Sequence, residues 1–500
     1  MPSGQPRKSK IRIIASLLFL GALFVFVLTN IILGNYFLVL VAGIITTLGA
    51  LYFWSPRNLL LVIIVLMPIL ASLKDYQIDV SPLLNLVNFQ ENYIVDFFFL
   101  ARAFILLLAI IEIGRRGWSF FRTPLSLVLL ISVGLNIISF FYSDYKLEGI
   151  AFYWVHLVAA FGAYFLGYFL FATRKRYLKI LMAIILSSVI PIIIGIKQIV
   201  LREFFFSSDS TLPRIQATFW HPNLLGSFLF VVTVVYLVFY LSIKVGKAGV
   251  KKKLLFFLPF LLFIPLLGLT FSRTSWVALA FAIFVIAIIR RPLRKPAILL
   301  GGLLTVLALL IERIRNRILD TFSWSINNSV SGRMENWDIG FFKLGERPWL
   351  GFGPGSFAEV LKDARGSEEG NTSAHSDAVR FLVEGGIIGL LSYLLYFVVA
   401  LIYAFTSFVH YPRSSKRIKF LGKGFLVDFK LLGFIPFLLF VSMVPISLME
   451  TSTFDFVYQF FAWIALGSWL AVSSKTIKTR KKRRITQHRK LKEVPAESSS

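Results

Sequence analysis

Apolar runs recur along almost the whole of this 500-residue chain and decide what it can fold into. A helix needs about 20 largely apolar residues to cross the hydrocarbon core of a bilayer. Fourteen segments reach or approach that length. They are residues 12–33, 36–53, 58–73, 93–113, 124–142, 150–172, 178–199, 223–243, 254–270, 274–290, 297–311, 378–405, 430–449 and 456–473. The sequence therefore predicts an all-α, polytopic bundle of about 12–14 transmembrane helices.

The composition indicates that lipid, rather than water, surrounds these helices. Hydrophobic residues make up 57% of the chain and Phe alone occurs 52 times, which is more than a soluble domain of this length can bury. Lys and Arg outnumber Asp and Glu by 53 to 25, an excess that nucleic-acid-binding proteins also show. Here most of these cations lie in alternate connections, as the positive-inside rule demands. We therefore expect no nucleic-acid partner and two cytoplasmic termini.

The predicted spans divide the chain into five parts. A short cytoplasmic tail, 1–11, precedes transmembrane helices with short connections over 12–311. A long connection, 312–377, is predicted to form a large extracytoplasmic subdomain before the last transmembrane helices, 378–473. The end of the chain, 474–500, is basic and then Ser-rich, and it is predicted to be a disordered cytoplasmic tail attracted to anionic lipid.

The long connection carries its own structural signals. Met334, Trp337, Phe341 and Leu344 fall on one helical stripe, which predicts a helix lying in the membrane interface. The stretch 351–355 contains three glycines and a proline and predicts a tight turn.

His375 is the first candidate for chemistry, because it lies just before the predicted span that begins near residue 378. The positive end of a helix dipole disfavours imidazolium, so a nearby imidazole stays able to accept a proton. Such a group suits a general base that activates a hydroxyl. For this residue alone, a purely structural role stays open. Further along the same span, Gly385 and Gly389 are predicted to let a neighbouring helix approach, and Arg380 and Glu384 to form an ion pair.

Arginines near the ends of spans are candidates for binding an anion. Arg214 lies just before a span, and Arg273 lies in a connection barely four residues long. Two converging guanidinium groups would hold a diphosphate through paired hydrogen bonds, although each could instead extend to lipid headgroups. Arg333 is a third candidate. His221, which opens another span, is expected either to cap that helix or to contact the substrate.

The sequence gives little support for metal or thiol chemistry. It contains no cysteine, its five histidines are scattered, and no Asp-x-Asp pair stands in a connection predicted to face outward. We therefore expect neither a metal site nor a cofactor.

Several of these residues together resemble the O-antigen ligase and polymerase family, which includes related bacterial O-oligosaccharyltransferases. The signature of that family is similar to His375-Ser376 followed by nine residues and then Gly386-x-x-Gly389. The resemblance covers about residues 200–400. Its other elements are Pro222-Asn223, Ser272-Arg273 and the run Arg333, Trp337, Pro348, Gly351, Gly353, Gly355 and Phe357.

The resemblance implies transfer of a glycan from undecaprenyl diphosphate to an acceptor hydroxyl on a lipid, a growing polysaccharide or a protein. The expected location is the outer face of a bacterial inner membrane, with membrane lipids as further partners. The implied chemistry is inverting and independent of metal, with His375 as the base and Arg214 and Arg273 on the diphosphate. Fourteen spans are more than the dozen usual for the ligases, which leaves ligase, polymerase and oligosaccharyltransferase open.

Two other functions stay open from the residues alone. A flippase or transporter of lipid-linked glycan would suit the span number, although such proteins usually show two similar halves, and no clear repeat is present here. A metal-dependent transferase that uses a lipid monophosphate sugar would need acidic residues in an early outer loop. Asp75 and Asp79 are the only nearby pair, and their spacing is wrong for a compact metal clasp.

Overall fold

The computed structural model describes residues 55–72, 77–79, 94–145, 157–207, 210–244, 257–319, 329–366, 372–412, 415–420, 423–451 and 455–492. The predicted spans at 12–33 and 36–53 lie outside these residues. The chain forms two compact units, Met1–Ile63 and Ile64–Ser500. All of the architecture below belongs to the second unit, apart from the first part of α3.

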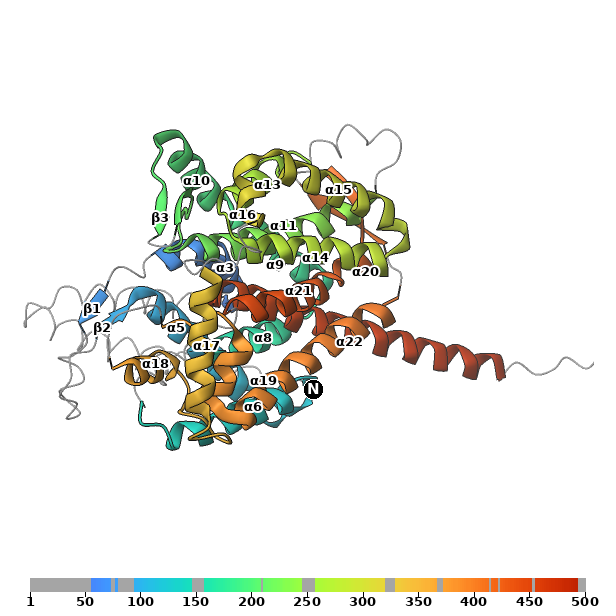
Figure 1. The fold of residues 1–500 in the computed structure, drawn as a ribbon. Helices are drawn as coiled ribbons and strands as arrows, with labels where there is room; N and C mark the ends of the chain where they lie inside the picture. Colours follow the sequence, from blue (N-terminus) through green and yellow to red (C-terminus); the bar gives the residue numbers. More distant parts are fainter. Residues whose placement is uncertain are drawn as a thin grey trace, which may run out of the picture. The chain divides into compact units, whose positions relative to one another are not determined.

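Helices make up most of the described chain (Figure 1). Each predicted span from 58–73 onward overlaps one or two of them, so the prediction of an all-α polytopic protein is confirmed. The helices are α3 (Pro56–Ser72), α5 (Phe97–Arg116), α6 (Ser126–Phe141), α8 (Ala159–Leu170), α9 (Arg174–Leu186), α10 (Val189–Leu201), α11 (Pro222–Ser242), α13 (Phe260–Leu269), α14 (Arg273–Ile289), α15 (Arg294–Leu310), α16 (Glu312–Leu319), α17 (Ser329–Leu344), α18 (Phe357–Arg365), α19 (Asp377–His410), α20 (Phe429–Leu432), α21 (Ile435–Met449) and α22 (Phe456–Lys492).

Several of these helices are long and apolar enough to cross a membrane. Among the described residues, six helical segments meet the requirements of length and composition, and a seventh does so if the bent pair formed by α5 and α6 counts as one span. The six are Arg174–Leu201, Pro222–Ser242, Arg291–Leu310, Asp377–His410, Phe429–Met449 and Phe456–Ile477. The chain is therefore a multi-pass membrane protein.

Short antiparallel strands, which were not predicted from the sequence, join some of the helices. β1 (Gln77–Asp79) pairs with β2 (Ile94–Asp96), and β3 (Phe205–Ser207) pairs with β4 (Ser210–Arg214). In a third sheet β7 lies between its two neighbours; its strands are β5 (Ile243–Lys244), β7 (Lys423–Asp428) and β6 (Ser415–Phe420). The β3–β4 hairpin helps to position a candidate site residue, because β4 ends at Arg214.

The first half of α22 is the central helix of this unit and packs closely against α8. Two glycines allow the close approach: a Cβ atom on Gly167 would lie 2.4 Å from the carbonyl oxygen of Ile464, and one on Gly467 would lie 2.0 Å from that of Tyr164. Residues 456–473 are buried throughout. A helix that is apolar all round belongs in such a position.

The second half of α22 corrects the prediction of a disordered tail from residue 474. The helix continues to Lys492, and its last part projects away from α8, α19 and α21 (Figure 1). No Gly or Pro interrupts residues 474–492, and Lys and Arg are good helix formers whose charge also suits a helix C-terminus. The high basic content that suggested disorder is therefore compatible with a helix.

At a break in α19, the helix forms backbone hydrogen bonds with the long connection, 312–377. Gly386 has φ 64° and ψ −162°, and the backbone of 348–353 forms hydrogen bonds with the helix on both sides of it. Ile387 N donates to Pro348 O at 2.9 Å, while Gly353 N donates to Glu384 O at 2.7 Å. A Cβ atom on Gly386 would lie 2.3 Å from Trp349 O, so only glycine fits there.

The break also corrects the role predicted for Gly385 and Gly389. A Cβ atom on Gly389 would meet Phe381 O of its own helix at 2.8 Å, whereas one on Gly385 would meet only Asn136 Oδ1, at 3.9 Å. Gly389 is therefore required by the shape of the broken helix itself, and not by a neighbouring helix.

Glu384 and Arg380 form the predicted ion pair, with Arg380 Nε donating to Glu384 Oε1 at 2.7 Å. The same carboxylate accepts the backbone N–H groups of Gly355, at 2.9 Å, and Phe357, at 3.3 Å. Glu384 thus satisfies backbone donors at the start of α18, where the helix dipole favours an anion. The pair is structural, as predicted.

Replacing Gly386 by Ala is expected to destabilise the protein strongly, because the backbone conformation is strained for a side chain, by about 1–3 kcal/mol, and the methyl group would also collide with Trp349. Gly385→Ala is the matched control, since the added methyl has room. Thermal unfolding in detergent measures both. Equal losses in the two variants would contradict this account of the break.

Candidate active site

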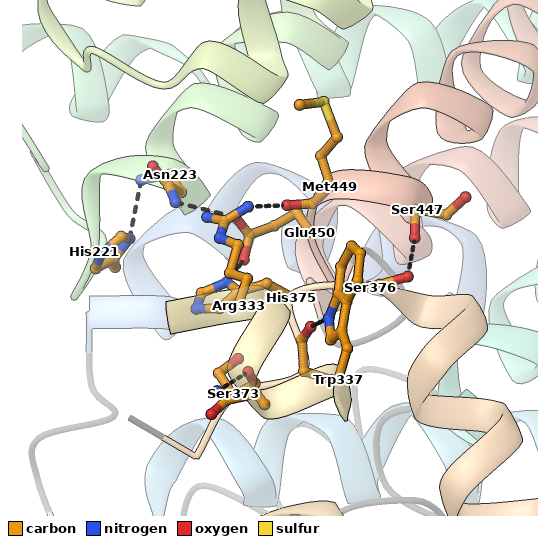
Figure 2. Close-up of polar contacts among 12 residues, drawn as sticks. His221, Asn223, Arg333, Trp337, Ser373, His375, Ser376, Ser447, Met449 and Glu450 are labelled. Carbon is orange, nitrogen blue, oxygen red and sulfur yellow. Dashed lines mark hydrogen bonds and ion pairs between the residues drawn. The ribbon is translucent and has the colours of Figure 1, made fainter. Parts of the chain in front are cut away.

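His375 and Glu450 form a hydrogen-bonded pair where two helix ends meet. His375 Nδ1 lies 2.8 Å from Glu450 Oε1. His375 directly precedes Ser376, whose side chain caps α19, and Glu450 directly follows the last residue of α21. Each of the two side chains is 19% exposed, so a substrate can reach the pair although most of it is shielded from solvent. Figure 2 shows this arrangement.

The segment that carries His375 is held from two sides (Figure 2). On one side α17 donates two side-chain hydrogen bonds to the preceding carbonyls, from Asn336 Nδ2 to Ser373 O at 2.9 Å and from Trp337 Nε1 to Ala374 O at 2.6 Å. On the other side Ser376 Oγ donates to Ser447 O of α21 at 3.3 Å. These contacts maintain His375 at φ 46°, a strained conformation of the kind that clusters at functional sites.

The Glu450 carboxylate also contacts Asn223 and Arg333. Asn223 Nδ2 donates to Oε2 at 3.2 Å, and Arg333 Nη2 lies 3.6 Å from the same oxygen. Arg333 donates a further hydrogen bond to the carbonyl of Met449. Burial alone would raise the pKa of Glu450, but the hydrogen bond from His375 and the charges of His375 and Arg333 outweigh it and lower the pKa to about 2.

The charge of Glu450 decides how the imidazole of His375 is protonated. An ionised carboxylate can only accept hydrogen bonds, so Nδ1 of His375 must donate. In the neutral ring Nε2 is then the nitrogen without a proton, and it can take one from a substrate. A carboxylate behind an imidazole is the arrangement that orients a histidine base and stabilises the imidazolium as it forms.

Asn223 connects this pair to Arg214. Its Oδ1 accepts from Arg214 Nη2 at 2.6 Å, and Arg214 Nε donates to the carbonyl of Thr270 at 2.7 Å. Arg214 is buried, with 4% of its surface exposed. The chain of contacts His375–Glu450–Asn223–Arg214 therefore joins the start of α19, the end of α21, the start of α11 and the end of β4.

The charges of two further arginines affect the pKa of Arg214. Burial, together with the positive charges of Arg317 and Arg273, lowers the pKa of Arg214 to about 10, against the opposing charge of Glu450. The guanidinium group is still protonated at neutral pH. Thr270, whose carbonyl accepts from Arg214, lies three residues before Arg273, and Ile314, one turn before Arg317, approaches Gly268 of α13, so Arg273 and Arg317 lie near Arg214. We call these three residues the arginine cluster.

His221 and Arg333 lie beside the same groups. His221 Nδ1 accepts from Asn223 N at 3.1 Å, so the capping role that was one of its two expected roles is confirmed. Burial, followed by the charge of Arg214, lowers the pKa of His221 to about 4, which leaves it neutral and able to cap. A contact of His221 or Arg333 with substrate stays a prediction.

The structure thus brings together the five residues singled out from the sequence and adds three that were missed as site residues. Asn223 was noticed only as part of a dipeptide. Glu450 could have been suspected as a carboxylate at the very end of an apolar span. Arg317 lies on the half-buried face of α16 together with Ile314 and Ile318, a spacing that is visible in the sequence.

Metal ligands do not gather in the described part of the chain. No group of three or more His, Asp or Glu side chains there is placed to hold a metal ion.

In a comparison with known families, residues 256–394 match the family described as O-Antigen ligase. The matched part contains Arg273, Arg333, His375 and the break at Gly386, whereas Glu450 lies beyond it. No curated protein matches the chain. The resemblance inferred from the sequence motifs is confirmed: residues 256–394 are similar to the O-antigen ligase family.

Proposed function

We propose that this protein is a membrane glycosyltransferase of the O-antigen ligase or polymerase type, which transfers a glycan from undecaprenyl diphosphate to an acceptor hydroxyl. The observation that carries the proposal is the row of contacts from the His375–Glu450 pair through Asn223 to the arginine cluster. It supplies a base for the acceptor and cations for a diphosphate within one small region.

In the proposed reaction, His375 Nε2 takes the proton of the acceptor hydroxyl. At the same time the oxygen of that hydroxyl attacks the anomeric carbon of the glycan. The bond from that carbon to the diphosphate oxygen breaks, with inversion at the carbon. Arg214 and Arg273 bind the diphosphate and stabilise the negative charge it gains on leaving. Glu450 orients the imidazole and stabilises the positive charge that the ring acquires.

The proposed location of this site is the outer face of a bacterial inner membrane, with both termini in the cytoplasm. The distribution of Lys and Arg supports this orientation, because connections rich in cations stay in the cytoplasm. By the same rule the starts of α11, α14 and α19 face outward. Lipid-linked glycan would therefore reach the site from the outer leaflet.

The proposal is tested with the purified protein in liposomes that contain undecaprenyl-diphosphate-linked glycan and, in parallel, a lipid, a glycan and a protein acceptor. We expect a joined product from one of these acceptors, together with released undecaprenyl diphosphate, and no loss of activity in excess chelator. Movement of the lipid-linked glycan across the bilayer without any joining would instead identify a flippase.

Arg317 is expected to contribute to donor binding, because it is the arginine of α16 that faces the protein near Arg214. Loss of one charge-assisted hydrogen bond costs about 1.5–3 kcal/mol, so Arg317→Gln should raise the KM for donor by about tenfold to a hundredfold. Arg315→Gln, on the exposed face of the same helix, is the control and should change the KM for donor by less than about twofold. Similar KM values for the two variants would remove Arg317 from the site.

A further inference from the structure

An apolar cavity lies among α11, α13, α14 and α15, on the part of these helices that the proposed reaction does not use. Its volume is about 430 Å³, within the range of small-molecule sites. Leu, Ile, Phe, Pro and Ala side chains form nearly the whole lining, and the exceptions are Thr233 and Tyr240. Such a cavity can hold hydrocarbon and offers almost nothing to a polar ligand.

The cavity borders the surface that faces lipid. Two of its lining residues, Leu261 on α13 and Leu303 on α15, are 59% and 53% exposed. In a membrane protein an exposed leucine of an apolar helix faces acyl chains. A hydrocarbon chain can therefore enter from the bilayer between α13 and α15 without crossing a polar barrier.

Each helix that lines the cavity leads, at the same end, to the candidate active site. α11 begins next to Asn223, and α14 begins at Arg273. α13 is followed at once by Thr270, the acceptor for Arg214. α15 is followed by α16, which carries Arg317; a Cβ atom on Gly268 of α13 would lie 3.6 Å from Ile314 Cδ1 of α16, so these segments are in contact.

The distances suit one long amphiphile. At 1.5 Å per helical residue, Leu279 of the cavity lies about 9 Å along α14 from Arg273, and Ile286 lies about 20 Å along it. A ligand with an anionic head on the arginine cluster would need a hydrocarbon chain of that length to fill the cavity.

We propose that the cavity binds part of the polyprenyl chain of the lipid carrier while its diphosphate lies on the arginine cluster. This inference rests on the proposed function, since it names where the apolar part of the same donor binds. The site selects for chain length: a carrier with a short chain reaches the arginine cluster but leaves the cavity empty. Ordinary phospholipid carries a single phosphodiester in place of a diphosphate, so the arginine cluster binds it less tightly.

The test fills the cavity and compares two donors that carry the same glycan, one on undecaprenyl diphosphate and one on geranyl diphosphate. Leu300→Trp places an indole in the cavity, and Leu299→Trp, on the adjacent residue that is 74% exposed and outside the lining, is the matched control. Wild-type protein should have the lower KM for the undecaprenyl donor. Leu300→Trp should raise that KM by about tenfold, as expected for losing the burial of a few methylene groups, and leave the KM for the geranyl donor within about twofold.

Three outcomes would overturn the inference. In the first, a folded Leu300→Trp protein, verified by gel filtration and thermal unfolding, shows equal changes or no change for the two donors. In the second, Leu300→Trp removes a co-purified phospholipid, detected by native mass spectrometry, without changing either KM, which would assign the cavity to bulk lipid. In the third, wild-type protein transfers glycan from neither donor, which marks failure of the proposed function itself.

Discussion

His375→Ala protein is expected to fold and insert normally but to transfer glycan about a thousandfold more slowly than wild type, the usual contribution of a general base. Asn223 still donates a hydrogen bond to Glu450 and Arg333 still balances its charge, so the substitution leaves no isolated buried ion. The measurement is the rate at saturating donor and acceptor in detergent or liposomes. Binding of the donor should change little, because the arginine cluster is intact.

The control for this substitution is His410→Ala. His410 lies at the other end of the same helix and is exposed, and its Nδ1 lies 2.8 Å from Thr406 O of its own helix. Its replacement should leave the rate within about twofold of wild type. Undiminished transfer by purified His375→Ala protein would refute the assignment of the base.

Glu450→Gln is expected to lower the rate by about a hundredfold or more, within the range for acid–base catalysis. The amide keeps the shape of the carboxylate, but it removes the negative charge that stabilises the imidazolium, and it leaves Arg333 beside a neutral group. Since the pKa of Glu450 is about 2, the wild-type group is ionised at every pH used for assays. Raising the pH should therefore not restore the transfer rate of the Glu450→Gln protein.

Glu335→Gln is the matched control for this charge. Glu335 lies on α17 and pairs with Arg365 at 3.1 Å, but its side chain is exposed, so the pair contributes little. If Glu450→Gln and Glu335→Gln gave similar rates, Glu450 would be a structural residue. A fall in donor affinity at unchanged rate would likewise remove it from the chemistry.

The positions of the helices could be predicted because apolar runs are a local property of the sequence. Each predicted span that lies in the described residues overlaps one or two helices, from α3 to α22. The break in α19 could not be found in this way. Gly386 alone resembles any glycine in a membrane helix, and its role depends on backbone bonds to residues 348–353, which are distant in sequence.

The candidate site was predictable in part for the same reason. His375, Arg214 and Arg273 are unusual for their places next to apolar spans, and each could be singled out without knowing its neighbours. Glu450 could not be singled out in this way, because its place in the site depends on a contact with His375, 75 residues away in the chain. The place of Arg317 depends in the same way on the folding of α16 back onto α13. Their catalytic and binding roles remain predictions.

The dependence of His375 on α17 has a consequence for protein engineering. Asn336 and Trp337 position the two residues before the histidine, Arg333 reaches Glu450, and the backbone of 348–353 completes the broken helix after it. A chimera that exchanged only the long connection, 312–377, or only α19, would separate groups that depend on one another. Residues 329–388 and Glu450 should therefore be exchanged as one set when this region is transplanted between related proteins.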